Sequence, residues 1–168
     1  MSVRHSETLR LRPPRHRVER RAIAWWTVQS SLIPVPTMLV VGTLYLLIPP
    51  ARFVFGWILL AVALPGIAYM AVMPLWRYRV HRWETTDQAV YTATGWLWQK
   101  WRVAPLSRIQ TVDTVRGPLE QLFGLSGIKV TTASASGDLK IRGIDHRQAL
   151  DVVEHLTRAT QATPGDAT

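Results

Sequence analysis

Two long apolar runs dominate the hydropathy pattern of the first half of the chain. The first covers about residues 22–48 and the second about residues 53–75, and neither contains Asp, Glu, Lys or Arg. A helix needs about 20 mostly apolar residues to cross a bilayer core, and helices of water-soluble proteins carry a polar face that both runs lack. The short connection at residues 49–52 therefore predicts an antiparallel hairpin of two transmembrane helices at residues 22–76.

The first apolar run is longer than a bilayer core requires. As one straight helix it would measure about 40 Å, against about 30 Å for the hydrocarbon layer, so it must tilt, kink or extend into the head-group layer. Pro34 and Pro36 predict a kink, because each removes a backbone donor and crowds the preceding turn. A cleaved signal peptide is not expected, because the run is too long and a second span follows.

Short alternating segments replace the apolar runs from Arg77 onward. Runs such as YRVHRWETT, AVYTATG, IQTVDTVR and GIKVTTAS are rich in β-branched and aromatic residues, and polar or glycine-containing turns separate them. This pattern predicts about seven short antiparallel strands in a small, partly open barrel. The predicted fold class is therefore a membrane α-helical hairpin followed by a mostly-β, α+β domain at residues 77–162.

One amphipathic helix is predicted to close this domain. Asp145 precedes Gln148 by three residues, which is the spacing of a capping box. Apolar residues with helical spacing then form a stripe of Ala149, Val152, Val153 and Leu156. Residues 163–168 are expected to be a disordered tail, and residues 1–21, which show no apolar periodicity, are expected to be a basic and largely unstructured one.

The formal net charge of +9 is concentrated around the predicted hairpin. Residues 1–21 carry seven arginines against two glutamates, Arg52 lies in the hairpin turn, and three arginines follow the second run, whereas residues 83–168 are neutral. A nucleic-acid-binding protein would carry its basic residues on the folded domain, so no nucleic-acid partner is expected. The positive-inside rule places such arginines beside cytoplasmic span ends. The charge therefore predicts a multi-pass protein of the cell membrane with both termini in the cytoplasm.

Two sets of residues are expected at the membrane surfaces, with membrane lipids as partners of the hairpin. Basic anchors, which contact anionic head groups or only fix the orientation of the hairpin, are Arg15, Arg17, Arg20, Arg21, Arg77, Arg79 and Arg82. Trp and Tyr concentrate at both interfaces of a bilayer, and the interfacial aromatics expected on this basis are Trp25, Trp26, Trp57 and Trp76.

A set of short motifs in residues 22–160 resembles a known family. They are an alternating segment that follows Gly95, the segment PLSRIQ at residues 105–110, LFGL at residues 122–125, and a later strand that ends in VTT. In this order, after two spans, they resemble small bacterial membrane proteins with a bacterial PH-like domain. The resemblance implies two near-orthogonal sheets capped by a C-terminal helix. It also implies a role in envelope maintenance or tolerance of membrane-active antimicrobials, often beside a larger relative with several such domains.

Few residues offer catalytic chemistry. The chain has no cysteine, which removes disulfides, thiolate metal sites and cysteine nucleophiles. His146 and His155 are nine residues apart on the predicted terminal helix, so they face different directions and share no metal within it. Together with His81, Asp113 and Asp145 they are expected to be ordinary surface or capping residues. No catalytic, metal-binding or cofactor-binding residue is predicted, no cofactor is expected, and the protein is expected not to be an enzyme.

The loop that joins the first two strands of the predicted domain is the expected place for lipid head-group binding in a PH-like domain. PH-like domains that grip phosphoinositides use basic residues there, whereas residues 84–88 contain two acids and no base. This departure argues against an inositide-type pocket and leaves general attraction through Arg77, Arg79 and Arg82. A lipid or membrane-stress sensor that binds anionic head groups is accordingly the alternative function.

A protein partner is the preferred hypothesis. The residues expected on the partner face are Trp96, Trp98, Trp101, Arg108 and Arg116. In a strand at residues 95–103, Trp96 and Trp98 share one face and Trp101 the other, and exposed aromatic residues mark interfaces. An equally weighted alternative is that Trp101 fills the core while Trp96 and Trp98 pack on the hairpin or under the helix.

The predicted function is a membrane-tethered PH-like binding module that acts as a scaffold for a protein. The partner is expected to be a membrane or cytoplasmic protein, with a multi-domain relative as one candidate and a second copy of the chain, in a homo-oligomer, as another. An edge strand at residues 109–116 offers a second surface, which accepts a peptide strand if it lies at a sheet edge. A transporter is a distant third hypothesis, since the two spans carry no intramembrane charge.

Overall fold

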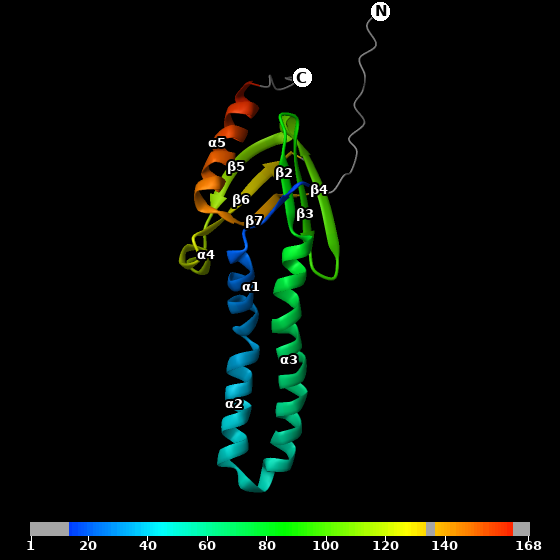
Figure 1. Cartoon of the computed structure of the whole chain (residues 1–168), viewed down its shortest axis with the longest axis vertical. Coiled ribbons are helices and arrows are strands. Elements are labelled where there is room, and N and C mark those ends of the chain that lie inside the picture. Colours follow the sequence, from blue (N-terminus) through cyan, green and yellow to red (C-terminus); the bar gives the residue numbers. More distant parts are fainter. Residues whose placement is uncertain (1–13, 134–136, 163–168) are drawn as a thin grey trace, which may run out of the picture.

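The protein consists of a long pair of helices that carries a sheet-rich domain at one end (Figure 1). The structure is a computed structural model and describes residues 14–133 and 137–162. The helices leave the domain on one side, and the strands lie almost entirely after them in the chain. The predicted division into two long apolar helices and a mostly-β domain is therefore confirmed.

Two helical arms form the hairpin. The first arm consists of α1 (Arg21–Ser31) and α2 (Pro34–Leu47), which are separate because Pro34 has no N–H to continue the hydrogen-bond pattern of α1. The 3-10 turn η1 (Pro49–Ala51) leads into the second arm, α3 (Arg52–Val80). Both arms are long and apolar enough to cross a membrane, and only 6% and 11% of their most apolar stretches are buried. The apolar side chains thus face outward and not into a protein core.

α3 is a continuous helix of 29 residues that includes two prolines. It extends beyond the predicted end of the second span at residue 75, and only His81 separates it from the first strand of the domain that follows it. At Gly66 the two arms come so close that a Cβ would lie 3.1 Å from the Pro34 Cβ. The glycine therefore permits close packing of the arms in the middle of the hairpin.

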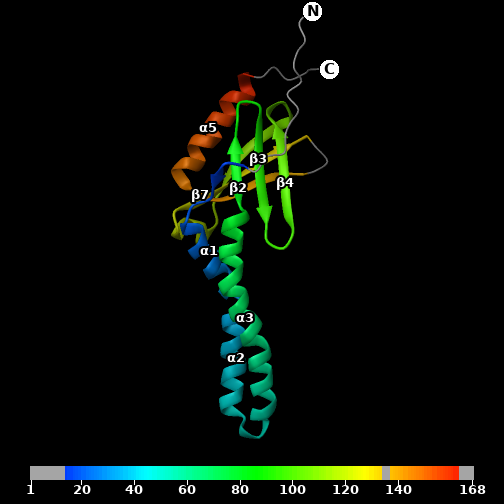
Figure 2. The ribbon, with the colours of Figure 1, turned by 45° about the vertical axis from the view of Figure 1, so that its right-hand side comes forward.

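Four antiparallel strands form the first sheet, in the order β1 (His16–Arg17), β2 (Arg82–Thr85), β3 (Ala89–Gly95) and β4 (Gln99–Pro105). β1 precedes the hairpin, β2 follows it, and the two strands pair directly. This pairing places the two ends of the hairpin on the same side of any membrane that it crosses. β2 runs away from the helices, so the β2–β3 turn lies at the far end of the domain and the β3–β4 loop returns to the helices (Figures 1 and 2).

Three antiparallel strands form the second sheet, in the order β5 (Ile109–Val115), β6 (Leu125–Thr132) and β7 (Leu139–Asp145). The 3-10 turn η2 (Leu106–Arg108) connects the two sheets, and the short helix α4 (Pro118–Leu122) connects β5 to β6. β5 and β7 are the edge strands of this sheet. The two separate sheets correspond to the architecture that the family resemblance implies.

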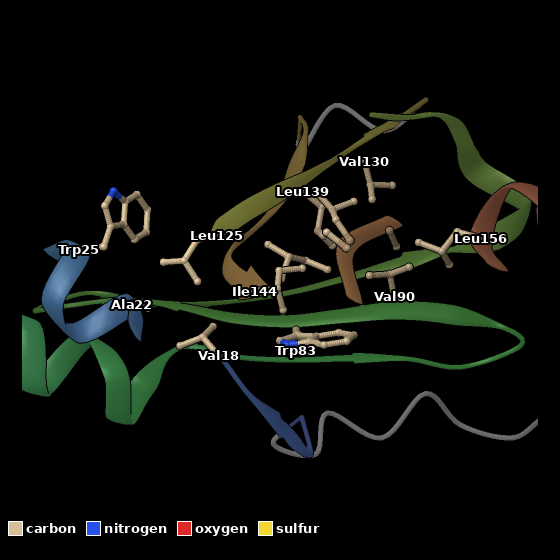
Figure 3. Close-up of a cluster of buried hydrophobic side chains, with 14 of the residues drawn as sticks. Val18, Ala22, Trp25, Trp83, Val90, Leu125, Val130, Leu139, Ile144 and Leu156 are labelled. Carbon is tan, nitrogen blue, oxygen red and sulfur yellow. The ribbon is translucent and has the colours of Figure 1, made fainter. Parts of the chain in front are cut away.

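The hydrophobic core lies between the two sheets and the terminal helix α5 (His146–Ala162) (Figure 3). Val90 of the first sheet and Leu156 of α5 are both fully buried in it. The predicted cap of this helix is confirmed, because the Asp145 carboxylate accepts a 2.9 Å hydrogen bond from the Arg147 N–H. The predicted apolar stripe of α5 thus faces the sheets.

Part of the segment that was expected to be unstructured belongs to this core. Pro14 is fully buried, β1 joins the first sheet and Val18 is 4% exposed, while residues 1–13 of the segment lie outside the described residues. Trp25 and Trp26 of α1 follow Val18 into the core and are also buried (Figure 3 labels Val18 and Trp25). The prediction of these two tryptophans as interfacial aromatics is corrected, because α1 packs against the domain before the chain continues into α2.

The predicted strand at residues 95–103 is also corrected. β4 begins at Gln99, so Trp96 and Trp98 lie in a loop and do not share a strand face. Residues 77–162 contribute six of the strands within the described part of the chain, and β1 joins them from before the hairpin. A strand that pairs across the hairpin leaves no local signal in a sequence pattern.

Candidate functional site

The loop between β3 and β4, Gly95–Trp98, is hereafter called the tryptophan loop. Gly95 has a φ of 131°, and a Cβ there would lie 1.9 Å from the Trp98 carbonyl oxygen. Only glycine meets both conditions. The tight reversal leaves Leu97 68% exposed and Trp98 79% exposed. Two large apolar side chains therefore occupy the tip of the loop.

The tryptophan loop packs against α3. The Trp76 indole N–H donates a 3.1 Å hydrogen bond to the Trp96 carbonyl oxygen, and the Trp96 ring meets the Tyr69 ring edge-on with 5.5 Å between centroids. Tyr69 and Trp76 are separated by about 10 Å along the helix axis, so Trp96 is held over two turns of α3. Leu97 and Trp98 consequently lie beside the exposed apolar surface of the hairpin.

α4 lies at the same end of the domain as the tryptophan loop, on the other flank of the helices (Figures 1 and 2). The Glu120 carboxylate accepts a 2.6 Å hydrogen bond from the Gly117 N–H and so stabilises the first turn. The helix ends at Leu122, whose side chain is 77% exposed. The domain thus presents exposed apolar residues on both flanks of the hairpin.

α1 is in close contact with β7 and is not a flexible linker. Gly143 has a φ of 78°, and a Cβ there would lie 3.0 Å from the Ala22 Cβ. The Gly143 carbonyl oxygen accepts a 2.9 Å hydrogen bond from the Glu19 N–H. A hydrogen-bonded ion pair joins Arg21 to Asp145 and lowers the pKa of the Asp145 carboxyl. These contacts fix the orientation of the first arm relative to the sheets.

His81 connects the end of α3 to the same core. Its ring centroid lies 5.0 Å from that of Trp26, and its Nδ1 lies 3.0 Å from the Arg77 carbonyl oxygen. Burial, together with the positive charge of Arg77, lowers the pKa of His81 to about 4. The imidazole is therefore neutral at physiological pH, so Nδ1 donates its proton to the carbonyl and the ring packs as an uncharged aromatic group.

A cavity of about 450 Å³ lies between α1, α4 and the second sheet, and is hereafter called the basic cavity. Trp25 and Gln29 line it from α1, and the start of α4 lines another wall. The second sheet contributes three basic residues to its lining, which are Lys129, Lys140 and Arg142. The cavity therefore brings cationic side chains of the domain next to the helix that leads into the apolar hairpin.

The cations of the basic cavity differ in their partners. Lys129 Nζ lies 3.0 Å from the Asp138 Oδ2, and this hydrogen bond lowers the pKa of Asp138. Lys140 is the cross-strand partner of Lys129, and Arg142 follows it on the same face of β7. Among the residues that the structure describes, neither Lys140 nor Arg142 lies within salt-bridge distance of a carboxylate. Two cations at the cavity are therefore available to an anion.

The five residues predicted as a partner face do not lie together. Trp96 and Trp98 belong to the tryptophan loop, whereas Trp101 and Arg108 line a separate cavity of about 210 Å³. Arg116 donates hydrogen bonds to backbone carbonyls of β6 and α4 and so serves the local fold. One of the two alternatives for the tryptophan cluster placed Trp96 on the hairpin, and Trp96 does pack there. The same alternative placed Trp101 in the core, whereas Trp101 is 43% exposed.

The predicted basic anchors are also divided between roles. Arg15 lies 3.8 Å from a Glu84 carboxylate oxygen, Arg21 pairs with Asp145, and the Arg77 guanidinium lies 5.6 Å from the Trp26 ring. The Arg21 contact joins α1 to β7, the Arg77 contact joins α3 to α1, and the Arg15 contact joins the residue before β1 to β2 of the first sheet. Contact with lipid remains a prediction for all seven anchors.

The remaining predicted aromatics lie on α3. Trp57 is 62% exposed and Trp76 is 47% exposed, so their place at the two interfaces stays a prediction. The acidic loop at residues 84–88 includes the β2–β3 turn, which lies at the far end of the domain from the hairpin (Figures 1 and 2). The basic cavity is thus well separated from the loop in which an inositide-type pocket was sought.

Part of the basic cavity has a local signal in the sequence. The segment LKIRGI alternates, so Lys140 and Arg142 share one face of a strand while Ile141 faces the core. The contribution of Trp25 and Gln29 has no such signal, because it depends on how α1 packs against the sheet.

The histidines considered for catalysis take structural positions. The His146 Nδ1 lies 2.9 Å from the hydroxyl of Ser126, which is fully buried, and this bond joins the start of α5 to β6. His155 lies on α5 with its Nε2 3.8 Å from a carboxylate oxygen of the exposed Asp87. Within the described ranges, no three His, Asp or Glu side chains are grouped so as to hold a metal ion.

Comparison with known proteins connects this architecture to a family. The family model described as bacterial PH domain matches residues 31–160, which include most of the hairpin and nearly all of the domain. The chain is 25% identical over 155 residues to the UPF0699 transmembrane protein YdbS of Bacillus subtilis (strain 168), and the alignment covers 88% of this chain and 95% of that protein. No solved structure matches the chain.

Proposed function

The chain belongs to the bacterial PH domain family of membrane proteins, and on this premise we propose that it is a non-enzymatic binding module mounted on the bilayer by its own helices. In the proposed arrangement the hairpin crosses the cell membrane and the domain lies on the cytoplasmic side. Leu97, Trp98 and Leu122 enter the head-group layer on the two flanks of the hairpin. The module binds ligands at the membrane surface.

The tryptophan loop is the observation that carries this proposal. Leu97 and Trp98 are exposed, yet the loop that bears them is held by hydrogen bonding and ring packing against α3. Removal of a large apolar side chain from water is worth roughly 1.5–3 kcal/mol, and Trp has a preferred place at the membrane interface. A bilayer around the hairpin would cover these side chains without any change in the protein.

A fixed mounting has a consequence for binding. The core contacts of α1 and the short connection between α3 and β2 hold the sheets in one orientation above the helices. A module held in this way does not search for the membrane in three dimensions, and it meets ligands of the membrane surface at a high effective concentration. Weak contacts with lipids or with neighbouring proteins are therefore sufficient for function.

The absence of cysteine from the sequence makes a direct test simple. The variants Leu97→Cys and Leu150→Cys each receive an environment-sensitive fluorophore in the full chain, reconstituted in phosphatidylcholine nanodiscs. Leu150 of α5 is a matched control, because it is an exposed leucine on the domain. Nitroxide groups near the lipid head groups are expected to quench the label at position 97 strongly and the label at position 150 weakly. Equal quenching at the two positions would refute the proposed orientation.

A scaffolding role for a protein partner is the second candidate function. β5 is an edge strand of the second sheet and exposes most of its side chains, as the addition of a peptide strand requires. Trp101 and Arg108 line a cavity formed mainly by β4 and the residues beside it, and this cavity offers a second surface to a protein. The family resemblance favours an envelope protein or a multi-domain relative as the partner.

The two candidates separate in a photocrosslinking experiment in cells. A photoreactive amino acid at Thr114, on the β5 edge, is expected to capture one defined protein, whereas the same group at Trp98 is expected to capture lipid. Position 150 on α5 again provides the control. The scaffolding proposal fails if position 114 gives the same pattern of adducts as position 150.

A further inference from the structure

We propose that the basic cavity is a binding site for the phosphate group of an anionic phosphate ester, supplied by a lipid head group or by a soluble compound. Where a lipid is the source, this inference rests on the proposed orientation of the domain. The phosphate chemistry rests only on the lining of the cavity. The site is distinct from the tryptophan loop and from the acidic β2–β3 turn at the far end of the domain.

Two cations that form no salt bridge in the described part of the chain, Lys140 and Arg142, are the first argument. Lys129 and Lys140 are directly opposite each other in the β6–β7 pair, and like charges in this position destabilise a sheet. Arg142 lies on the same face of β7, two residues along. A phosphate oxygen placed between these side chains would replace repulsion by charge-assisted hydrogen bonds, for which guanidinium and ammonium groups are the usual partners.

The acidic residues near the cavity form no salt bridge with Lys140 or Arg142 within the described residues. Asp138 is bonded to Lys129, and Asp113 is the β5 partner of the same lysine. Glu120 lies in the lining, and one of its carboxylate oxygens accepts a hydrogen bond from the backbone N–H of Gly117, the residue before α4. Asp113 and Asp138 thus face Lys129, Glu120 is held at the start of α4, and Lys140 and Arg142 are left without a salt bridge across the described ranges.

The position of the cavity along the helix is the second argument. Gln29 lines the cavity, and the exposed apolar surface of the first arm begins at Leu32 and Ile33, which are 56% and 79% exposed. Three to four residues correspond to about 5 Å along a helix. The head-group layer on each side of a bilayer is about 5–8 Å thick. The cavity therefore lies at the depth of lipid phosphates if the hairpin is inserted as proposed.

The shape and mixed lining of the cavity also fit an amphiphilic ester. A volume of about 450 Å³ lies in the range of sites for small ligands. Trp25 and Leu119 offer apolar surface beside the three cations. An ester with a phosphate and a glycerol backbone can place its charge on Lys140 and Arg142 and its carbon atoms on the apolar wall.

The test compares two pairs of substitutions that remove the same charge. Lys140→Gln with Arg142→Gln alters the cavity, whereas Arg147→Gln with Arg158→Gln alters exposed residues of α5. The full chain in phosphatidylcholine nanodiscs that contain a phosphatidylglycerol with a photoactivatable head group is irradiated, and the crosslinked peptides are identified by mass spectrometry. The second arm adds photoactivatable glycerol phosphate to nanodiscs of phosphatidylcholine alone.

The expected result is crosslinking to the peptides of α1 and β7 that line the cavity. Each cation near an anionic surface contributes about fivefold in binding, so the cavity pair should lower the yield more than tenfold while the α5 pair leaves it unchanged. The pair Lys140→Arg with Arg142→Lys keeps the charges and should retain the yield. A cavity pair with wild-type yield, or an α5 pair with the same loss, would overturn the proposal. Unchanged thermal unfolding of the cavity pair shows that the domain is folded.

The two arms distinguish the source of the phosphate and keep this inference separate from the proposed orientation. Crosslinking of phosphatidylglycerol alone assigns the site to lipid, and crosslinking of glycerol phosphate alone assigns it to a soluble ester. The fluorophore at position 97 is measured on the same samples. Strong quenching without any phosphate adduct would refute the basic cavity and leave the orientation intact. Weak quenching with adducts of glycerol phosphate only would refute the orientation and leave the cavity intact.

Discussion

Two pairs of tryptophans lie near the junction between helices and sheets, and they are used in opposite ways. Trp25 and Trp26 are buried where α1 meets β7 and the end of α3, and they hold the first arm in the core of the domain. Trp96 and Trp98 occupy a loop on the other flank, where Trp96 is held on α3 and Trp98 is 79% exposed. Trp25 and Trp26 therefore join the domain to the hairpin, whereas the loop that carries Trp96 and Trp98 faces the surroundings of the hairpin.

The residues next to an aromatic pair in the sequence therefore do not determine whether the pair is buried. Both pairs lie near one end of a helix of the hairpin, and each is followed directly by a polar residue, Thr27 or Gln99. The two pairs differ in the strand that covers them. β7 covers Trp25 and Trp26, whereas within the described residues no strand covers the tip of the tryptophan loop.

Truncation of the buried pair should be far more damaging than truncation of the exposed pair. Trp26→Ala removes a fully buried indole and is expected to lower the stability of the domain by about 3–5 kcal/mol. Trp98→Ala removes the same group from an exposed tip and should change stability by less than about 0.5 kcal/mol. Thermal unfolding of the full chain in detergent measures both. Similar shifts for the two variants would abolish the contrast between the pairs.

Acid should weaken the buried side of the junction through His81. Its pKa is about 4 in the folded protein and about 6.5 when exposed, so the unfolded state binds more protons between these values. Stability should therefore fall as the pH drops from about 6.5 toward 4, by up to about 3 kcal/mol. Thermal unfolding as a function of pH measures this loss.

Two histidine variants make this prediction specific. His81→Asn removes the titrating ring and should flatten the pH profile in that range, whereas His155→Asn, on the exposed surface of α5, should preserve it. A profile of His81→Asn that matches the wild type would show that other groups cause the acid sensitivity.

Glycine substitutions test the close approach of α1 to β7. Gly143→Ala forces a side chain into a left-handed conformation and places its Cβ 3.0 Å from the Ala22 Cβ, with an expected cost of about 1–3 kcal/mol. Gly137→Ala is the matched control, because its φ is 75° but no atom lies within 4 Å of the added Cβ. Thermal unfolding should place Gly143→Ala below Gly137→Ala. The reverse order would argue against a tight contact with α1.

The smallest expected effect concerns the attachment of the tryptophan loop. Trp76→Phe keeps an aromatic ring on α3 but removes the N–H that bonds to the Trp96 carbonyl, which should cost about 0.5–1.5 kcal/mol within the loop. The label at position 97 should then occupy a wider range of distances from the nitroxide groups, so its quenching should become less uniform. Trp57→Phe, far from the loop at the start of α3, should leave the label unchanged. A label that responds to both variants would indicate a general effect on the hairpin.

Elements with a strong local period were predictable from the sequence. The uncharged runs at residues 22–48 and 53–75 gave the two arms, Pro34 gave the break in the first arm, and the capping residue Asp145 gave the start of α5. The alternating segments gave most strands of the domain. Each of these features depends on residues that are neighbours in the chain, so the pattern contains the required information.

Features that depend on contacts between distant segments were not predictable in this way. β1 has two residues and forms only because β2 lies beside it. Trp25 and Trp26 have the composition of interfacial residues, and their burial follows from the position of Gly143 on β7. The basic cavity likewise joins α1 to strands far along the chain. Only the alternation of Lys140 and Arg142 gave a local signal for it.

The pairing of β1 with β2 has a consequence for how the protein is made. β1 and Val18 are synthesised before the first arm, and their partners are synthesised only after the second arm. If the hairpin crosses the membrane as proposed, the domain can be completed only after the chain has returned to the side of the membrane on which β1 lies. A chain whose second arm stayed outside the bilayer would separate β1 from β2 and leave the sheet incomplete for proteases to attack. In the proposed topology, a complete first sheet would therefore distinguish a chain whose hairpin is inserted from one whose hairpin is not.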